Sequence, residues 1–188
     1  MRDLLHWDTQ VKDACIKKSF TPRIQKDLLL YPPAKKMPDI GQGLYLFGPT
    51  ESGKTILSAH LLLEEQKQIY LEGGPASNED VCVMVSMGEL LYQIKATFQQ
   101  GGGNEVELID YYSKVRLLVL DDFGTIKPTD WVIATLYTII NYRYEWLKKT
   151  IINSNLSLSE MARVMGDDRI TSRIERMCRI IQKTKSWE

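Results

Sequence analysis

Five short apolar runs punctuate the chain, separated by longer segments that mix polar and apolar residues. They are rich in Val, Ile and Leu, which is typical of strands buried on both faces of a sheet. The runs lie at 44–47, 81–85, 115–120, 151–152 and 178–181. Because strands that alternate with helices favour a parallel arrangement, the pattern predicts an α/β fold with a five-stranded parallel sheet between two layers of helices.

The segments between these runs predict the helices. The clearest is 129–148, where apolar residues recur at helical spacing on one face. Further helices are expected at 4–17, shortly before Tyr31, at 54–68, at 87–98 and in a polar stretch that ends near residue 176. The glycine-rich segment 99–104 predicts a plain connection. We expect one compact domain core over residues 40–188, preceded by a short helical N-terminal extension over residues 1–39.

Composition narrows the class of protein. The chain has 188 residues, of which 44% are hydrophobic and 26% charged, as in ordinary globular domains. No apolar run is long enough to span a membrane, and the polar start MRDLLHWDTQ does not resemble a signal peptide. Three widely spaced cysteines lack metal-site spacing, so buried reduced thiols and a cytoplasmic location are expected.

Charge is distributed unevenly although the net charge is zero. Residues 1–40 carry +3, residues 41–130 carry −7 and residues 131–188 carry +4. One interpretation is scattered solvated charge. The other is an acidic central part flanked by basic surfaces that meet nucleic-acid phosphates, and composition does not decide between them.

The strongest motif is a complete G-x-x-x-x-G-K-T between a predicted strand and a predicted helix. Such a loop bends so that backbone N–H groups surround a phosphate chain, and the following helix presents its positive end to the anion. Lys54 is then expected to reach the β- and γ-phosphates, and the Thr55 hydroxyl to bind Mg²⁺. The expected ATP-binding residues are Gly48, Pro49, Thr50, Glu51, Ser52, Gly53, Lys54, Thr55 and Ile56.

A second acidic site follows the apolar run LLVL. In a parallel sheet the carboxyl ends of strands border the ligand crevice, so Asp121 and Asp122 are expected near the phosphates. Asp121 would hold Mg²⁺ through water, and Asp122 would orient or deprotonate the attacking water. The alternative is that both carboxylates only cap the following turn.

Taken together, these segments resemble the DnaC/IstB-like helicase-loader and transposition-helper ATPases, a branch of the AAA+ proteins related to DnaA. The resemblance runs from about residue 20 to 182. It is carried by segments at 43–55, 117–124, 141–144, 150–157 and 166–174. It implies a three-layer αβα P-loop NTPase fold of AAA+ type, without a full C-terminal lid domain.

The resemblance also assigns two further site residues. Asn155 looks like the sensor residue that contacts the γ-phosphate or the attacking water, with Asn153 as the fallback. Arg173 looks like an arginine finger that would reach the nucleotide of a neighbouring subunit, with Arg169 as the alternative. The second acid, Asp122, is a Glu in many AAA+ proteins, so a slow ATPase stimulated by oligomer formation or DNA is expected.

The function implied is that of an ATP-hydrolysing helicase loader in DNA replication initiation. It would assemble as a homo-oligomer through Arg173 in trans, bind single-stranded DNA and engage a replicative helicase in a bacterial cell, encoded by the cell, a phage or a plasmid. An IstB-like transposase helper and an ATP-dependent assembly switch with little hydrolysis remain alternatives. A small-molecule kinase fits less well, because those enzymes rarely end a strand in LLVLDD.

Overall fold

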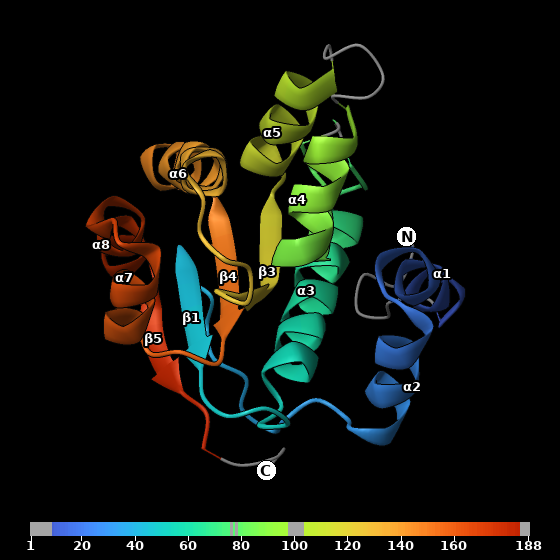
Figure 1. Ribbon diagram of the computed structural model, residues 1–188. Coiled ribbons are helices and arrows are strands. Elements are labelled where there is room, and N and C mark those ends of the chain that lie inside the picture. Colours follow the sequence, from blue (N-terminus) through green and yellow to red (C-terminus); the bar gives the residue numbers. More distant parts are fainter. Residues whose placement is uncertain (1–8, 76, 78, 98–103, 185–188) are drawn as a thin grey trace.

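The computed structural model describes residues 9–75, 77, 79–97 and 104–184. A parallel sheet has helices on both faces, which gives three layers (Figure 1). Its strands are β1 Gly43–Phe47, β2 Cys82–Ser86, β3 Leu117–Phe123, β4 Lys149–Ser154 and β5 Arg179–Gln182. They lie in the order β2-β3-β4-β1-β5, and every pair is parallel, as the sequence predicts.

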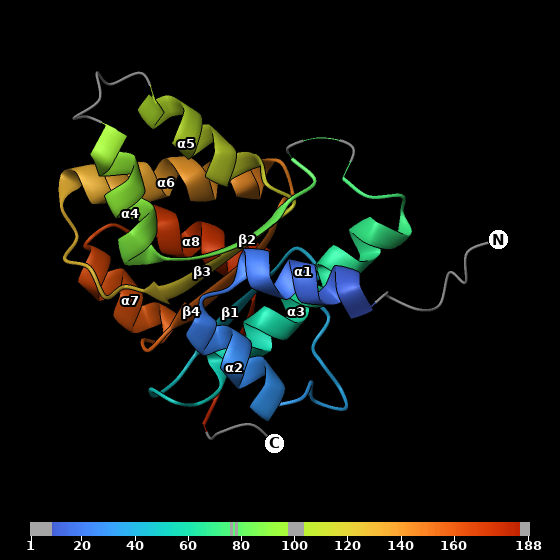
Figure 2. The same cartoon turned by 90° about the vertical axis from the view of Figure 1, so that its right-hand side faces the viewer.

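One group of helices covers each face of this sheet (Figure 2). On one face lie α1 Thr9–Ser19, α2 Pro22–Leu30 and α3 Lys54–Leu71. On the other face lie α4 Met87–Ala96, α5 Asn104–Lys114, α6 Asp130–Glu145, α7 Leu158–Met165 and α8 Asp168–Met177. A hydrophobic core lies on each side of the sheet. Alternate side chains of β1 contribute to both, since Tyr45 packs on one side and Leu44 and Leu46 on the other.

Helix α5 is missing from the sequence prediction, which assigns no helix to residues 105–114. Its apolar pattern is weak because Val106 is exposed and only Tyr112 and Ser113 are buried. Its ends carry the expected charges instead, with Glu105 in the first turn and Lys114 in the last. The predicted connection at 99–104 lies almost entirely outside the described residues.

Three other boundaries differ from the prediction. Strand β3 ends at Phe123, one residue beyond the two carboxylates with which the apolar strand was expected to end. The polar helical stretch is broken into α7 and α8 at Gly166, which has a left-handed φ of 64°. Residues 4–8 of the first predicted helix lie outside the described residues, and α1 begins at Thr9.

A buried arginine connects three elements on the α5–α6 side of the sheet. Arg143 of α6 has no exposed surface. It donates at 3.0 Å to the carbonyls of Tyr112, Ser113 and Val115, at 2.9 Å to the Thr150 hydroxyl, and to the carbonyl of Lys149. Arg143 therefore satisfies carbonyls left over at the end of α5, where the helix dipole also favours a cation.

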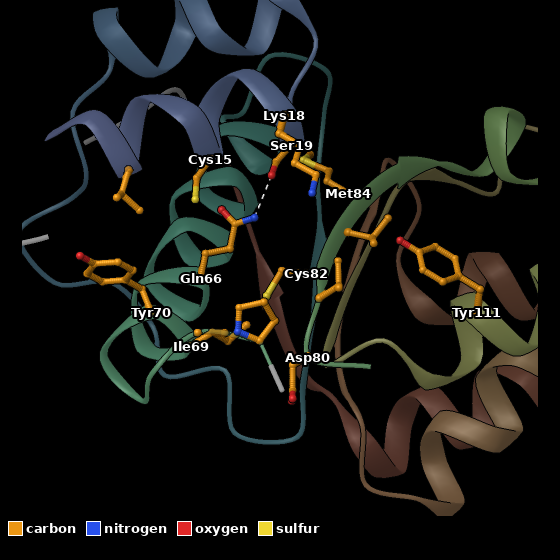
Figure 3. A pocket seen from close by; sticks show the side chains of 15 residues that line it. Cys15, Lys18, Ser19, Gln66, Ile69, Tyr70, Asp80, Cys82, Met84 and Tyr111 are labelled. Carbon is orange, nitrogen blue, oxygen red and sulfur yellow. Dashed lines mark hydrogen bonds between the residues drawn. The ribbon is translucent and has the colours of Figure 1, made fainter. Parts of the chain in front are cut away.

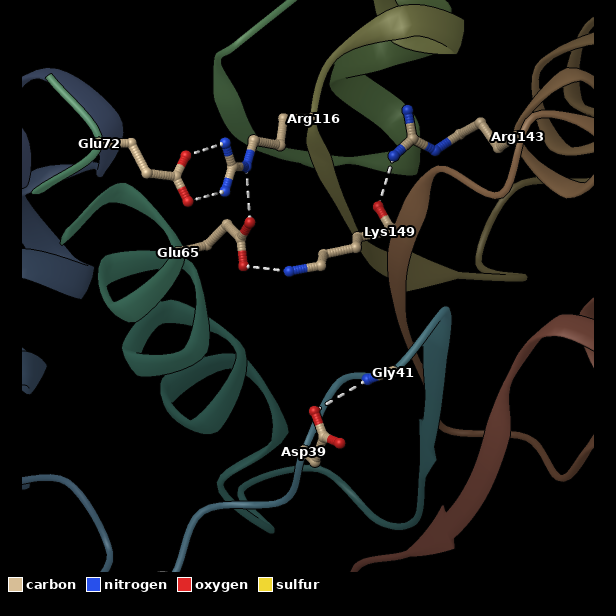
Figure 4. A network of polar contacts seen from close by, with 7 residues as sticks. All are labelled: Asp39, Gly41, Glu65, Glu72, Arg116, Arg143 and Lys149. Carbon is tan, nitrogen blue, oxygen red and sulfur yellow. Dashed lines mark hydrogen bonds and ion pairs between the residues drawn. The ribbon is translucent and has the colours of Figure 1, made fainter. Parts of the chain in front are cut away.

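An ionic network joins the end of α3 to the beginnings of β3 and β4 (Figure 4). The buried Glu65 carboxylate lies 2.7 Å from Arg116 Nε and 2.7 Å from Lys149 Nζ. Arg116 also pairs at 2.7 Å with Glu72, whose side chain is exposed. Burial alone would raise the pKa of Glu65, but the hydrogen bonds from Lys149 and Arg116 outweigh it and the pKa is lowered.

Replacing Glu65 with Gln should lower the free energy of unfolding by about 2–3 kcal/mol at neutral pH, because two cations lose a buried carboxylate while both remain partly in water. A lowered pKa means that this contribution is complete above pH 4.5 and disappears as the pH falls through the folded-state value. Urea unfolding at pH 7 and pH 3.5 checks both statements. The matched control, Glu72→Gln at the exposed end, should leave the urea midpoint close to that of the wild type. Equal effects of the two variants would contradict the prediction.

Candidate functional site

The phosphate-binding loop connects β1 to α3 and depends on two glycines. Gly48 has a φ of 145°, and a Cβ atom there would lie 2.0 Å from the carbonyl oxygen of Lys183, which follows β5. Gly53 has a φ of 82° directly before the first residue of α3. Both positions therefore require glycine, one for close approach and one for a left-handed turn. Glu51 also has a left-handed backbone, with φ 64°, and is exposed.

Lys54 is folded back onto the loop that precedes it. Its Nζ donates at 2.9 Å to the carbonyl of Gly48, at 2.8 Å to that of Pro49, and at 3.1 Å to Asn155 Oδ1. Burial lowers the pKa of this amine, while the charges of Asp121 and Asp122 oppose that effect. A buried ammonium group held mainly by neutral oxygens is well placed to exchange these partners for an anion.

Asp121 is the centre of a second set of contacts. The Thr55 hydroxyl donates to its two carboxylate oxygens at 3.2 and 3.0 Å, and Asn153 Nδ2 donates at 2.9 Å. Burial raises the pKa of Asp121; the hydrogen bond from Asn153 opposes this, and the charge of Asp122 adds to it. No Lys or Arg makes an ion pair with Asp121 in the described part of the chain, so a bound cation would stabilise its charged form.

Ser58 is a member of this set that sequence analysis overlooked. It is fully buried, and its hydroxyl donates at 2.8 Å to Asn153 Oδ1. The amide group of Asn153 is thereby oriented with its nitrogen toward Asp121. Ser58 is four residues after Lys54 on α3, so the helical repeat places it on the same face. That spacing could have identified it.

Asp122 differs from Asp121 in both exposure and backbone. It is exposed and has a left-handed φ of 54°. Its carbonyl accepts hydrogen bonds from the Thr125 amide at 3.3 Å and the Thr125 hydroxyl at 2.9 Å. Asp and Asn adopt this backbone more readily than longer side chains do, which gives a physical reason for Asp rather than Glu here.

The two asparagines at the end of β4 contact different members of the site. Asn155 is exposed and accepts from Lys54, whereas Asn153 is buried and contacts Asp121. Both candidates for the sensor residue are therefore linked to the phosphate loop or its acidic partner. Only Asn155 already contacts the group expected to bind the terminal phosphates.

Arg173 and Arg169 are not part of this cluster. Arg173 of α8 contacts Asn141 and Tyr137 of α6, and Arg169 forms an ion pair with Asp167 at 2.6 Å. Neither makes a hydrogen bond to the phosphate loop within the described residues. Hydrogen bonds thus join Lys54 to Asn155, and Thr55 and Asn153 to Asp121, whereas the two candidate fingers lie on α8.

Comparison with known protein families shows to which family this chain belongs. The sequence pattern of the family described as IstB-like ATP binding protein matches residues 37–186. The chain belongs to this family. The match covers the phosphate loop, both carboxylates, both asparagines and both α8 arginines, so this IstB-like chain is an ATP-binding protein with the fold of AAA+ P-loop domains.

Individual relatives of this IstB-like protein agree with the assignment. YqaM of Bacillus subtilis (strain 168), an uncharacterized protein, is 29% identical over 141 residues, which are 71% of this chain and 40% of the relative. The replicative helicase loader DnaC of Escherichia coli (strain K12) is 24% identical over 85 residues, 45% of this chain and 35% of DnaC. The chain thus matches less than half the length of these relatives.

A solved structure supports the fold. The crystal structure of the DnaC helicase loader superposes with a TM-score of 0.62 at 23% identity, covering 96% of this chain and 94% of that one. At that identity the likeness establishes the arrangement of the sheet and helices and nothing about chemistry.

The residues of the IstB-like site fit MgATP. At Gly48 the loop packs so closely against the Lys183 carbonyl that a side chain would not fit. The Lys54 ammonium group is bound to neutral carbonyls, which it can exchange for phosphate oxygens. Thr55 and Asp121 supply the hydroxyl and carboxylate oxygens that Mg²⁺ prefers. When bound, Mg²⁺ would neutralise charge on the phosphate oxygens. Among the described residues no group of three or more His, Cys, Asp or Glu side chains could hold a metal.

Two cavities lie along the edge strand β2. The first, of about 440 Å³, is between α1, α3 and β2 and is lined largely by apolar groups, with Cys15 and Cys82 on opposite sides (Figure 3). Burial raises the pKa of both thiols, to about 12 for Cys82. The second, of about 490 Å³, includes Asp121. Neither cavity is lined by residues of the phosphate loop.

No helix in the described ranges is long and apolar enough to cross a membrane.

Proposed function

We propose that this IstB-like protein is an ATP-hydrolysing helicase loader that acts in DNA replication initiation. The observation that carries the proposal is the hydrogen-bonded cluster of Lys54, Thr55, Asp121 and Asn155 around the phosphate loop. Lys54 would bind the β- and γ-phosphates, and Thr55 and Asp121 would hold Mg²⁺. Asp122 would accept a proton from the attacking water, and Asn155 would orient that water or the γ-phosphate.

The proposed partners of this chain are inferred from its relatives and from its charge distribution. The DnaC relative is a replicative helicase loader, so we propose a replicative helicase as the partner of this chain. Basic segments at 1–40 and 131–188 would bind single-stranded DNA, with an affinity that falls as salt rises. Arg173 would complete the ATP site of the next subunit in a homo-oligomer. Such a loader would work in the cytoplasm of a bacterial cell, whether the cell, a phage or a plasmid encodes it.

Two other functions share the same ATP site. A transposase helper, after which the family is named, would remodel duplex DNA. An assembly switch would bind ATP and turn it over very slowly. The loader is favoured because a named helicase loader matches both in sequence and in fold.

The test is steady-state ATP hydrolysis measured against protein concentration, with and without single-stranded or duplex DNA. A loader whose site is completed in trans should show a specific activity that rises with concentration and with single-stranded DNA. Stimulation by duplex DNA alone supports the transposase helper. ATP binding without turnover at any concentration supports the switch. Either result would remove the loader proposal.

Replacing Asp122 with Asn should lower turnover by at least about a hundredfold, because a general base is lost. Asn tolerates the left-handed backbone, so thermal stability and ATP affinity should stay close to wild type. Asp122→Ala should lose the same activity and about 1 kcal/mol of stability, because Ala resists this backbone. Turnover by the Asn variant within threefold of wild type would exclude Asp122 as the base.

A further inference from the structure

The two arginines of α8 gather around one tyrosine of α6. The guanidinium carbon of Arg169 lies 5.0 Å from the centre of the Tyr137 ring, and that of Arg173 lies 4.8 Å from it. Both distances are within the range of cation–π attraction. Arg169 and Arg173 are four residues apart on one helix, where like charges repel, and the shared ring offsets that repulsion.

Arg173 is held more firmly than its neighbour. Its Nε donates to Asn141 Oδ1, its Nη2 donates to the Tyr137 hydroxyl at 3.0 Å, and its Nη1 donates to the Arg169 carbonyl at 3.1 Å. Arg169, by contrast, is 60% exposed and pairs with Asp167 two residues away. The orientation of Arg173 is therefore set by another helix, whereas that of Arg169 is set locally.

These contacts leave the outer part of the Arg173 guanidinium available. A guanidinium has five N–H groups, and the described residues accept hydrogen bonds from three of them. The remaining two are on different terminal nitrogens, and Arg173 is only partly buried. A planar group that is held by three hydrogen bonds and keeps two further N–H groups can still donate to a phosphate from a second subunit.

The contacts are not needed to join α8 to α6. Ile170 and Ile174 of α8 are completely buried, and they pack in the same core as Leu136, Ile139 and Ile140 of α6. Removing the polar contacts would leave that packing in place. A positioning function explains their geometry better than a contribution to folding does.

We propose that Asn141 and Tyr137 are positioning residues that hold Arg173 in the orientation required to reach the ATP bound by a neighbouring subunit. The proposal rests on the trans-acting arginine of the proposed function and adds the residues that control it. An unrestrained arginine side chain loses rotamer entropy when it is fixed. Asn141 and Tyr137 would fix it before assembly, so less is lost when subunits meet.

A mixing experiment with two defective subunits tests the proposal. Lys54→Ala subunits cannot bind nucleotide but carry a correctly held Arg173. Asn141→Ala subunits bind nucleotide but present Arg173 poorly. Asn141→Ala alone should turn over ATP about tenfold more slowly than wild type, with unchanged nucleotide affinity. Excess Lys54→Ala subunits should raise the rate per Asn141→Ala subunit at least about fivefold.

Three controls separate positioning from other effects. The double variant Lys54→Ala, Arg173→Ala should give no rescue. Tyr137→Phe keeps the ring and its packing but loses the hydroxyl acceptor, and it should show a smaller, equally rescuable loss. Thr138→Ala is the matched control, since this exposed α6 hydroxyl bonds to Ala134 in its own helix and should leave turnover unchanged.

The outcomes distinguish this proposal from the proposed function. Normal turnover in Asn141→Ala while Arg173→Ala is impaired would overturn positioning alone. A loss in Asn141→Ala that Lys54→Ala subunits fail to rescue would also overturn it, because the defect then lies in the variant's own site. Normal turnover in Arg173→Ala, or none in wild type, would overturn the trans-acting arginine itself and positioning with it.

Discussion

Replacing Arg143 with Met is expected to lower the free energy of unfolding by about 5 kcal/mol, enough to unfold a large part of the protein at room temperature. The variant loses five hydrogen bonds and removes the guanidinium donor from four backbone carbonyls, of which those of Tyr112, Ser113 and Val115 lie in buried contacts. Each unsatisfied buried group costs about 1–3 kcal/mol, and whole domains are stable by only about 5–15 kcal/mol. Urea unfolding followed by far-UV circular dichroism measures the loss.

Two further variants show whether the geometry of Arg143 matters. Arg143→Lys keeps the charge but replaces a planar fork by a single ammonium group, so an intermediate loss of stability is expected. Arg176→Met on the exposed surface of α8 makes the same exchange without a buried partner, and should change stability by less than about 0.5 kcal/mol. Similar urea midpoints for Arg143→Met and Arg176→Met would show that the buried network contributes little.

The central strands β1, β3 and β4 were predictable because they are buried on both faces. Runs such as Leu117–Leu120 contain no polar residue, so strand identity and the parallel arrangement could be inferred from composition and from the helices between them. Helix α5 could not be inferred in this way. It lies on the outside of the fold and buries few of its residues, so tertiary contacts such as those of Arg143 define its end.

In the candidate site, too, some residues could be predicted from the sequence and others only from the fold. The residues of the phosphate loop and Asp121 follow from local motifs, because backbone geometry alone determines where a loop after a strand presents its N–H groups. Asn155 was assigned through the family resemblance and not through a local motif. The left-handed backbone of Asp122 has no such motif in the sequence. The contacts of Arg173 with Tyr137 and Asn141 join positions more than thirty residues apart, so only the fold could reveal them.

Sequence patterns also do not predict which groups Lys54 contacts when no nucleotide is bound. The motif predicts a lysine that faces phosphate, whereas the structure has Lys54 bound to Gly48, Pro49 and Asn155. Nucleotide binding must therefore replace one set of oxygen partners by another. The net gain is the difference between a charged phosphate and neutral carbonyl and amide oxygens as acceptors, which favours phosphate.

Replacing Lys54 with Met is expected to weaken ATP binding by about a hundredfold. Hydrogen bonds to charged groups contribute about 1.5–3 kcal/mol, and 1.4 kcal/mol corresponds to a factor of ten in affinity. Met preserves most of the volume of this buried side chain, so stability should fall by less than about 1 kcal/mol. Titration with a fluorescent ATP analogue measures the affinity, and thermal unfolding measures the stability.

The control is Lys67→Met, which removes the same charge from the same helix about 20 Å further along. It should bind nucleotide like wild type, because no phosphate can reach that distance. If the two variants bound ATP equally well, the affinity would depend on the net charge of the protein rather than on one ammonium group. If only Lys54→Met lost affinity for ATP, the affinity would depend on the ammonium group at the N-terminus of α3. The helix terminus and the lysine act there on the same anion, so neither can substitute for the other.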